Sequence, residues 1–194
     1  MSAATVRGRT ARAWGWHRLA ESWARRVVAA ADVRPGDLVL DVGAGEGALT
    51  GPLLAAGARV IAVELHADRR AALRRRFGSD VTLVGADASS LRLPRRPFRV
   101  VSSPPYSVST ALLRRLLAPG SQLRSADLVL QRAVVARFVD GRAPGSGRWS
   151  RDFVLHRGLA LPRTAFTPPP RVDSAVLVIR ASSGRPTRRG ANSR

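Results

Sequence analysis

Residues 38–47 read Leu-Val-Leu-Asp-Val-Gly-Ala-Gly-Glu-Gly, a short apolar run that passes directly into a glycine-rich loop. A run of this length predicts a buried strand, and glycines allow the backbone to turn tightly and to approach a ligand closely. Residues 48–56 follow as a predicted helix that ends at Gly57. This strand–loop–helix unit predicts the start of a parallel sheet that binds a ligand at the carboxyl ends of its strands.

The same alternation of short apolar runs and helical patterns continues on both sides of this unit. Further strands are predicted at 59–64, 81–84, 98–102 and 126–130. Helices are predicted at 18–31, 67–77, 109–117 and 131–139. Strands that alternate with helices favour parallel βαβ units, and therefore an α/β fold with helices on both faces of the sheet.

The alternation stops in the C-terminal third of the chain. Residues 153–161 and 174–180 are apolar, and the stretch 162–170 that joins them is rich in proline. Since prolines prevent a crossover helix there, the two apolar segments are predicted to form an antiparallel hairpin at the sheet edge. Residues 140–151 contain three glycines, one proline and three arginines, and are predicted to form a mobile loop.

The two ends of the chain differ from its centre. Residues 1–13 and 182–194 are rich in arginine and lack apolar periodicity, which predicts a disordered basic arm and a disordered basic tail. Residues 14–181 are then expected to form a single domain, because 194 residues allow one full domain and little more.

The charge of the chain points to a polyanionic partner. There are 33 basic and 13 acidic residues, a formal net charge of +20, and no lysine, so every one of the 33 is an arginine. A compact domain with this charge repels itself unless a polyanion neutralises it, and the planar guanidinium group suits phosphates and base edges. We therefore expect contact with nucleic acid.

Two absences in the sequence restrict the chemistry. The chain has no cysteine, which excludes disulfides, zinc knuckles and thiol nucleophiles, and fits a reducing compartment. No apolar run approaches the roughly 20 residues that a membrane span needs. We expect a cytoplasmic protein without a metal or a membrane partner, and a monomer by default.

Acidic side chains follow the strands next to the glycine loop. Gly43 and Gly45 belong to that loop, Glu64 closes the next strand, and Asp87 comes just after the third strand. A carboxylate at the position of Glu64 accepts hydrogen bonds from ribose hydroxyls, and Asp87 is placed to receive an adenine amine. These features predict a nucleoside pocket, although a nicotinamide-dependent dehydrogenase would share the glycines and the first acid.

A stiff corner follows the strand at 98–102. Ser103-Pro104-Pro105-Tyr106 contains two prolines that lack N–H donors, so its carbonyls are expected to point outward beside an aromatic ring. Carbonyl acceptors that hold the exocyclic amine of an adenine would aim its lone pair at a methyl donor, and Tyr106 is suited to stack on a base that has left its helix. The plain structural alternative is a strand-ending turn with a packed tyrosine.

The glycine loop, the two acids and this corner together resemble the ribosomal RNA adenine N6-methyltransferases of the Erm and KsgA group. The segments Gln131–Val135 and Leu161–Val176, the second with its spaced prolines, agree with the signatures of that family. The similarity covers about residues 14–180 and looks closest to the Erm branch. Members of that branch methylate one adenine in the 23S rRNA of the large subunit, which blocks macrolide, lincosamide and streptogramin B binding.

The resemblance implies a Rossmann-like methyltransferase fold with a mostly parallel seven-stranded sheet and an antiparallel C-terminal strand. It also implies 23S rRNA as the partner, before ribosome assembly is complete. S-adenosylmethionine is the implied cofactor, bound by His17, Leu19, Gly43, Gly45, Glu64, Leu65, Asp87, Ala88 and Ser103. The implied catalytic residues are Ser103, Pro104, Pro105, Tyr106 and Phe166, of which the two aromatic residues would bracket the target adenine. The arginines expected to contact RNA are Arg7, Arg9, Arg12, Arg114, Arg132, Arg142, Arg148 and Arg163.

Three departures from the family leave alternatives open. Ser103 stands where the family has asparagine, and Trp16-His17 replaces the usual Gln-Asn pair. Only about 14 residues, 181–194, follow the last predicted strand, where typical members carry a helical domain that grips RNA. The alternatives are an RNA-binding or assembly factor that has kept the fold and lost the chemistry, and a methyltransferase that acts on DNA adenine or a small molecule.

Overall fold

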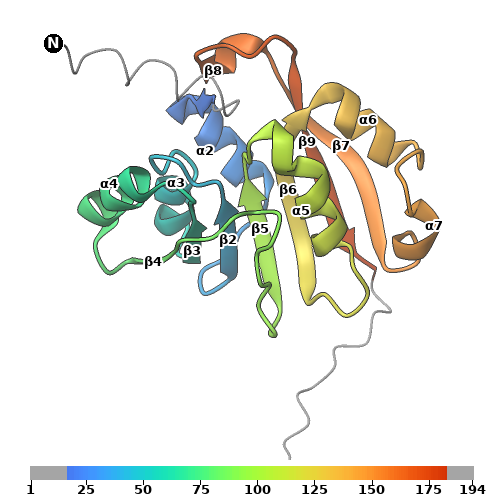
Figure 1. Ribbon diagram of the computed structural model, residues 1–194, viewed down its shortest axis with the longest axis horizontal. Helices are drawn as coiled ribbons and strands as arrows, with labels where there is room; N and C mark the ends of the chain where they lie inside the picture. The colour runs from blue at the N-terminus through green and yellow to red at the C-terminus, as the bar shows by residue number, and fades with distance from the viewer. Residues whose placement is uncertain (1–16, 183–194) are drawn as a thin grey trace, which may run out of the picture.

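A twisted seven-stranded sheet forms the centre of the computed structural model, which describes residues 17–182 (Figure 1). Its strands lie in the order β4-β3-β2-β5-β6-β9-β7. Their bounds are β2 (Leu38–Val42), β3 (Arg59–Val63), β4 (Val81–Val84), β5 (Phe98–Ser102), β6 (Leu123–Gln131), β7 (Phe153–Leu161) and β9 (Ser174–Ala181). The first five of these strands pair in parallel, whereas β9 is antiparallel to both β6 and β7. The predicted sheet and its C-terminal hairpin are therefore confirmed.

Helices cover both faces of the sheet, as predicted. The helices are α2 (Glu21–Ala30), α3 (Thr50–Ala55), α4 (Ala67–Phe77), α5 (Ser109–Leu116), α6 (Arg132–Val139) and the single turn α7 (Ser146–Trp149). Because side chains alternate along a strand, each strand supplies both layers. On β2, Val39 belongs to the buried cluster that includes side chains of α2, α3 and α4, and Leu40 belongs to the one that includes side chains of α5 and α6.

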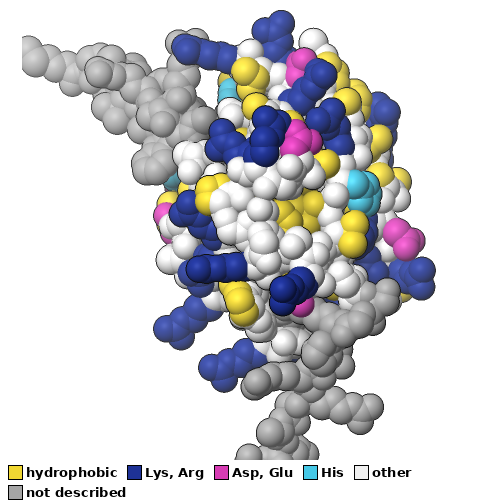
Figure 2. Space-filling view, turned by 90° about the vertical axis from the view of Figure 1, so that its right-hand side faces the viewer, with side chains coloured by type: hydrophobic (Ala, Val, Ile, Leu, Met, Phe, Trp, Pro, Cys, Tyr) yellow, Lys and Arg dark blue, Asp and Glu magenta, His cyan; other side chains and the backbone are white. Residues whose placement is uncertain are grey.

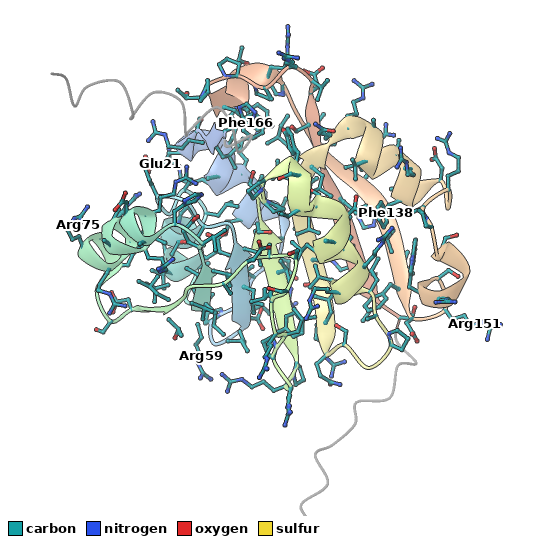
Figure 3. All side chains as sticks on the ribbon, in the orientation of Figure 1. Glu21, Arg59, Arg75, Phe138, Arg151 and Phe166 are labelled. Atoms are coloured by element: carbon teal, nitrogen blue, oxygen red, sulfur yellow. The ribbon has the colours of Figure 1, made fainter. Side chains whose placement is uncertain are left out.

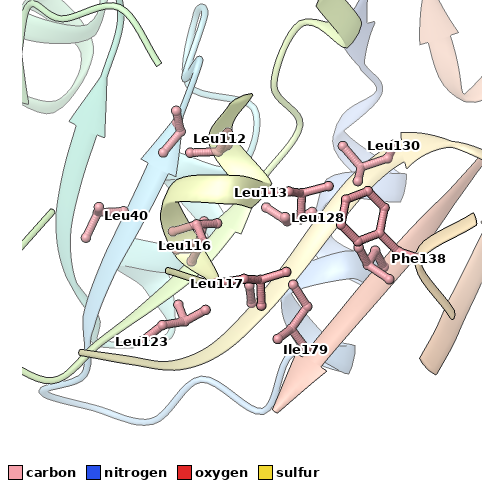
Figure 4. Close-up of a cluster of buried hydrophobic side chains, with 14 of the residues drawn as sticks. Leu40, Leu112, Leu113, Leu116, Leu117, Leu123, Leu128, Leu130, Phe138 and Ile179 are labelled. Carbon is pink, nitrogen blue, oxygen red and sulfur yellow. The ribbon is translucent and has the colours of Figure 1, made fainter. Parts of the chain in front are cut away.

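The layer on the α5 side holds the larger group of buried leucines (Figure 4). Leu112, Leu113 and Leu116 of α5 are fully buried against Leu128 of β6. With buried Ser109 they lie at i, i+3, i+4 and i+7, which explains why this segment is a helix, since one buried stripe faces the sheet. The stripe fixes α5, and with it the turn that precedes α5, at the carboxyl ends of β5 and β6.

The predicted first helix, 18–31, is wrong at its start. Residues Arg18–Leu19 form a short strand, β1, that pairs antiparallel with β8 (Phe166–Thr167), and the helix begins at Glu21. The backbone N–H of Ala20 donates to the carbonyl of Ala165 at 2.8 Å, which fixes this pairing. Two segments far apart in the sequence therefore lie side by side above α2 (Figure 1).

Two other segments, the start of β6 and the predicted loop 140–151, also differ from the prediction. Strand β6 begins at Leu123 rather than at 126, because it pairs with β5 from Phe98 onward. The predicted mobile loop 140–151 contains α7, whose Trp149 is buried and stacks on Phe138 with ring centroids 6.0 Å apart. That aromatic contact anchors the segment to α6.

In the described range 17–182, no helix combines the length and the apolar character that crossing a membrane requires. The predicted arm at 1–13 lies outside the described residues, as does all but the first residue of the predicted tail.

Candidate functional site

The glycine-rich loop after β2 wraps the end of β3. The amides of Gly43 and Ala44 both donate to the carbonyl of Val63, at 2.8 and 3.1 Å. Gly43 has a φ of 75° and Gly45 a φ of 58°, a left-handed conformation that glycine adopts without strain. The backbone of the loop therefore lies close to the carboxyl ends of β2 and β3, in space that a side chain would otherwise fill.

The loop also touches the proline corner. A Cβ atom added to Gly43 would lie 2.9 Å from Cδ of Pro105 and 3.4 Å from Cα of Pro104. Contacts this short leave no room for a side chain, so the two motifs depend on a glycine at this position. The predicted proximity of glycine loop and corner is present in the structure.

Two adjoining pockets open at this junction, and Gly43 lines both of them. The larger, which we call the acid pocket, has a volume of about 640 Å³, which includes space open to solvent. The predicted residues on its wall are Gly43, Glu64, Leu65, Asp87, Ala88 and Pro105. The smaller, which we call the loop pocket, has a volume of about 330 Å³. The predicted residues on its wall are His17, Leu19, Gly43, Gly45 and Ser103.

Glu64 is held in one orientation at the end of β3. Its Oε2 accepts a hydrogen bond from the amide of Gly45 and its Oε1 accepts one from the amide of His66, both at 2.9 Å. Each carboxylate oxygen has a second lone pair, so the group can still accept two hydroxyl donors. The arrangement suits the two hydroxyls of a ribose, and Leu65, 48% exposed, adds an apolar surface to the same wall.

Asp87 presents an ionised carboxylate to the acid pocket. Its Oδ1 accepts a hydrogen bond from the amide of Ser89 at 2.7 Å. Hydrogen bonding from Ser89 lowers the pKa of Asp87 below its ordinary value, so the group is an acceptor at neutral pH. An acceptor here matches the predicted contact with an adenine amine.

Asp41 is a functional candidate to which the sequence analysis gave no role. It is only 1% exposed, lines the loop pocket, and accepts a hydrogen bond from the hydroxyl of Thr50 at 2.7 Å. Burial raises the pKa of Asp41 to about 7, with a smaller raising contribution from the nearby carboxylate of Glu64 and in spite of the hydrogen bond from Thr50, which lowers it. No ion pair between described residues includes Asp41. A buried carboxylate without a cation favours a positively charged ligand in this pocket.

The corner itself is fixed by hydrogen bonds on both sides. The carbonyl of Pro105 accepts from the amide of Val108 at 3.1 Å and from the hydroxyl of Ser109 at 3.3 Å, so it belongs to the turn. The acceptors that remain as candidates for an incoming amine are those of Ser103 and Pro104. The hydroxyl of Tyr106 lies 2.6 Å from Oγ of Ser174, and burial raises the pKa of this tyrosine.

The two outer residues of the predicted site, His17 and Phe166, differ in their surroundings. Nδ1 of His17 lies 2.7 Å from the carbonyl oxygen of Pro168, and its ring centroid is 5.9 Å from that of Tyr106. Phe166, in β8, is 3% exposed and belongs to the buried cluster that includes Ala24 and Val27 of α2 (labelled in Figure 3). In this conformation Phe166 offers little surface to a base, and its role beside the adenine stays a prediction.

Five of the predicted RNA-binding arginines lie within the described residues. Arg7, Arg9 and Arg12 lie outside the described residues. Arg114 and Arg148 are exposed on α5 and α7, and Arg142 pairs with Asp140. Only Arg132 and Arg163 line a common groove. No group of three or more potential metal ligands occurs between residues 17 and 182.

Comparison with known proteins adds family information to this geometry. A family model described as "Ribosomal RNA adenine dimethylase" matches residues 20–189. The ribosomal RNA small subunit methyltransferase A of Ralstonia nicotianae is 38% identical over 163 residues, which cover 78% of this chain and 57% of that protein. Its counterpart from Thermosynechococcus vestitus is also 38% identical, over 89% of this chain and 70% of its own length. The chain thus spans less than three fifths of the Ralstonia relative.

Solved structures show the same architecture. The 23S rRNA methyltransferase ErmE superposes with a TM-score of 0.75 and 27% identity, over 91% of this chain and 73% of ErmE. A dimethyladenosine transferase from Plasmodium falciparum has a TM-score of 0.73 at 23% identity, over 86% of this chain and 64% of that one, which bears on the fold alone.

Proposed function

Since the chain belongs to the ribosomal RNA adenine dimethylase family, we propose that it transfers a methyl group to the exocyclic N6 amine of an adenine in ribosomal RNA. Its fold is the Rossmann-like fold of the S-adenosylmethionine-dependent methyltransferases. S-adenosylmethionine is the cofactor of this proposal.

One observation carries the proposal: Gly43 is packed against Pro104 and Pro105. Through this contact, the wall of the acid pocket and the loop pocket continues into the Ser103–Tyr106 corner. A methyl donor bound in the pockets and an adenine amine bound at the corner would then lie close together. Such closeness is what a direct group transfer requires, because positioning supplies much of the rate.

The residues of the pockets fit the parts of the cofactor. Glu64 suits the ribose hydroxyls, Asp87 suits the adenine amine, and buried Asp41 suits the positive charge of the methionine portion. When bound, the cofactor supplies an electrophilic methyl group on a sulfonium. The acceptors of Ser103 and Pro104 would orient the adenine amine, and Tyr106 would stack on the base. These tasks are orientation and exclusion of water, and they need no general base on the protein.

We propose 23S rRNA as the first substrate to test, which retains the sequence-based expectation. The likeness to ErmE over 91% of the chain supports this choice. The small-subunit methyltransferases among its relatives make 16S rRNA the competing substrate. Methylation of 23S rRNA in the cytoplasm would be accompanied by macrolide, lincosamide and streptogramin B resistance, whereas methylation of 16S rRNA would not.

The test is transfer of tritiated methyl from S-adenosylmethionine to naked 23S rRNA, naked 16S rRNA and duplex DNA. Label in one rRNA, mapped to a single adenine by primer extension, is the expected result. Primer extension on rRNA from cells with and without the protein, paired with macrolide susceptibility, separates the two rRNA substrates. Absence of transfer to either rRNA, with cofactor binding demonstrated by calorimetry, would refute the catalytic claim.

Ser103 favours a second candidate function, an rRNA-binding or assembly factor without catalysis. Its side chain is shorter than the asparagine of the family and lies on the wall of the loop pocket. Loss of a well-placed acceptor at a transition state costs about 2–4 kcal/mol, or roughly a hundredfold in rate. A Ser103→Asn variant that gains transfer from an inactive parent would establish the binding factor; one that changes the rate of an active parent would exclude it.

A further inference from the structure

The connection between β4 and β5, residues 85–97, leaves part of one sheet face without a helix. Among the crossovers that join the parallel strands within residues 17–182, it alone contains no helix, whereas α3, α4 and α5 occupy the others. Pro94 and Pro97 disfavour a helix there, because proline lacks an N–H donor and restricts the residue before it. In Figure 1 this green segment passes in front of the sheet on the way from β4 to β5. The layer that α5 and α6 form on this face is therefore incomplete over β2, β3 and β4.

An open groove, which we call the crossover groove, lies beside this connection. It has a volume of about 910 Å³, including space open to solvent. Apolar side chains from three strands and from the connection line it: Leu38, Leu40, Ile61, Val63, Val84, Leu91 and Leu93. Ile61 and Leu93 remain partly exposed, whereas Val100 and Leu128, in the cluster that includes the leucines of α5, are fully buried. A hollow, partly exposed apolar surface of this kind is typical of a site for a partner.

Three arginines accompany this apolar surface. Arg92, Arg95 and Arg96 of the connection line the crossover groove, and all three are exposed. No ion pair between residues 17 and 182 includes any of them, and no acidic residue from this part of the chain lines the groove. The complementary ligand therefore carries apolar side chains together with negative charges.

The charge of the chain itself argues against occupation by its own ends or by a second copy. Residues 1–16 contain three arginines and no acidic residue, and residues 183–194 contain four arginines and no acidic residue. A second copy brings a net charge of +20, and Figure 2 shows many basic and few acidic side chains on the face towards β7. Each of these occupants would bring like charges together.

The apolar side chains of the crossover groove also argue against a nucleic acid. A single strand would neutralise the arginines, but the described residues of the groove include no aromatic side chain on which a base could stack. Aliphatic side chains from three adjacent strands instead match the apolar stripe of a helix, which is what covers the neighbouring strands on this face.

We propose that the crossover groove binds an acidic amphipathic helix of a partner protein. The helix takes the place of the missing crossover helix, with its apolar stripe on the side chains of β2, β3 and β4 and its carboxylates beside Arg92, Arg95 and Arg96. Apolar side chains at i, i+3, i+4 and i+7 of the partner anchor it, and the arginines select for acidic neighbours. This interaction goes beyond the proposed function and does not depend on methyl transfer.

The two isoleucines of the chain allow a direct test by NMR. Ile61 lines the crossover groove, and Ile179 is fully buried in the cluster that contains the leucines of α5 (Figure 4). Protein labelled with ¹³C at the isoleucine δ1 methyl groups therefore gives one signal from the groove and one internal control. The probe is a synthetic peptide of about 18 residues, with leucines at helical spacing and glutamate and alanine elsewhere. A matched peptide has lysine in place of each glutamate.

The glutamate peptide is expected to shift the Ile61 signal until it saturates and to leave that of Ile179 unchanged, and the lysine peptide to shift neither. Arg95→Gln with Arg96→Gln should weaken the binding of the glutamate peptide about fivefold, because each exposed ion pair contributes a small factor. Arg74→Gln with Arg75→Gln removes two exposed charges from α4, on the opposite face of the sheet, and should bind like the parent (Figure 3, Arg75). Thermal melting verifies that both variants are folded.

Four results would overturn the proposal. An Ile61 signal that the glutamate peptide leaves unchanged would remove the groove as a binding site. Equal shifts with both peptides would show that the groove does not select for acidic partners, and equal losses in both double variants would show that net charge alone attracts the peptide. A saturable shift of the Ile61 signal by polyuridylate as large as that by the glutamate peptide would assign the groove to nucleic acid instead. Because no methyl transfer is measured, each result stands whether or not the proposed function is confirmed.

Discussion

Replacement of buried Asp41 by asparagine is predicted to remove a pH dependence from the stability of the cofactor-free protein. Burial raises the pKa of this carboxyl group from 3.8 to about 7, a change of about 3 pKa units. At about 1.36 kcal/mol per unit, the folded state favours the protonated form by roughly 4 kcal/mol. Because the pKa in the folded state lies above that in the unfolded state, this stabilisation is complete below about pH 4 and is lost as the pH rises towards 7.

The assay is urea unfolding of the parent and Asp41→Asn between pH 4 and pH 8, without cofactor. The difference in the free energy of unfolding between the two proteins should change by up to about 4 kcal/mol over this range, in favour of the variant at high pH. Asparagine can still accept the hydroxyl of Thr50, so the variant imitates the protonated acid. Asp80→Asn, at an exposed position, is the control and should leave the pH dependence unchanged.

The same carboxyl group should couple cofactor binding to pH. A cation in the loop pocket favours the ionised form of Asp41, so the affinity of the parent for S-adenosylmethionine should rise with pH up to about 7 and then level off. The Asp41→Asn variant should bind more weakly and without this rise. The reasoning would be refuted if the stability of the parent and of the variant depended on pH in the same way, and their affinities did too. Such a result would show that Asp41 does not titrate in this range.

Three further predictions follow from the site. Gly43→Ala should weaken cofactor binding at least tenfold in calorimetry and lower the stability by about 1–3 kcal/mol, because its Cβ has no space at a φ of 75°. Tyr106→Phe should lower the free energy of unfolding in urea by about 1–3 kcal/mol, since it leaves the buried hydroxyl of Ser174 without its partner. The variant should keep methyl transfer, and loss of transfer would assign the tyrosine hydroxyl a part in catalysis. Glu64→Gln should weaken cofactor binding by about 2 kcal/mol and also lower the melting temperature, because the NH2 group of glutamine cannot accept from one of the two backbone amides that Glu64 binds; an unchanged affinity would exclude Glu64 as the ribose acceptor.

Much of the fold was predictable because it depends on local patterns. Each strand of the seven-stranded sheet contains a short apolar run, and the prolines between β7 and β9 exclude a crossover helix. Glu64 and Asp87 were predictable as wall residues of a pocket because the carboxyl ends of parallel strands share one edge. These predictions need only the periodicity of apolar residues along the chain and the direction of the strands.

The features that were missed depend on contacts between distant segments. Strand β1 has only two residues and exists through its pairing with β8, which no local pattern reveals. The role of Asp41 depends on its burial, and the position of Arg157 and Arg171 on one groove depends on how the fold brings β7 beside the segment that precedes β9. Sequence spacing carries no information on either property.

The pairing of β1 with β8 has a consequence for biosynthesis. Residues 17–19 complete the wall of the loop pocket, and they are held there by residues 166–168, which the ribosome adds much later. A nascent chain that has reached β5 already contains the glycine loop and both acids, but not the segment that secures His17. In the proposed function, the cofactor would therefore be captured in its final geometry only late in synthesis, and would not act as a nucleus around which the chain folds.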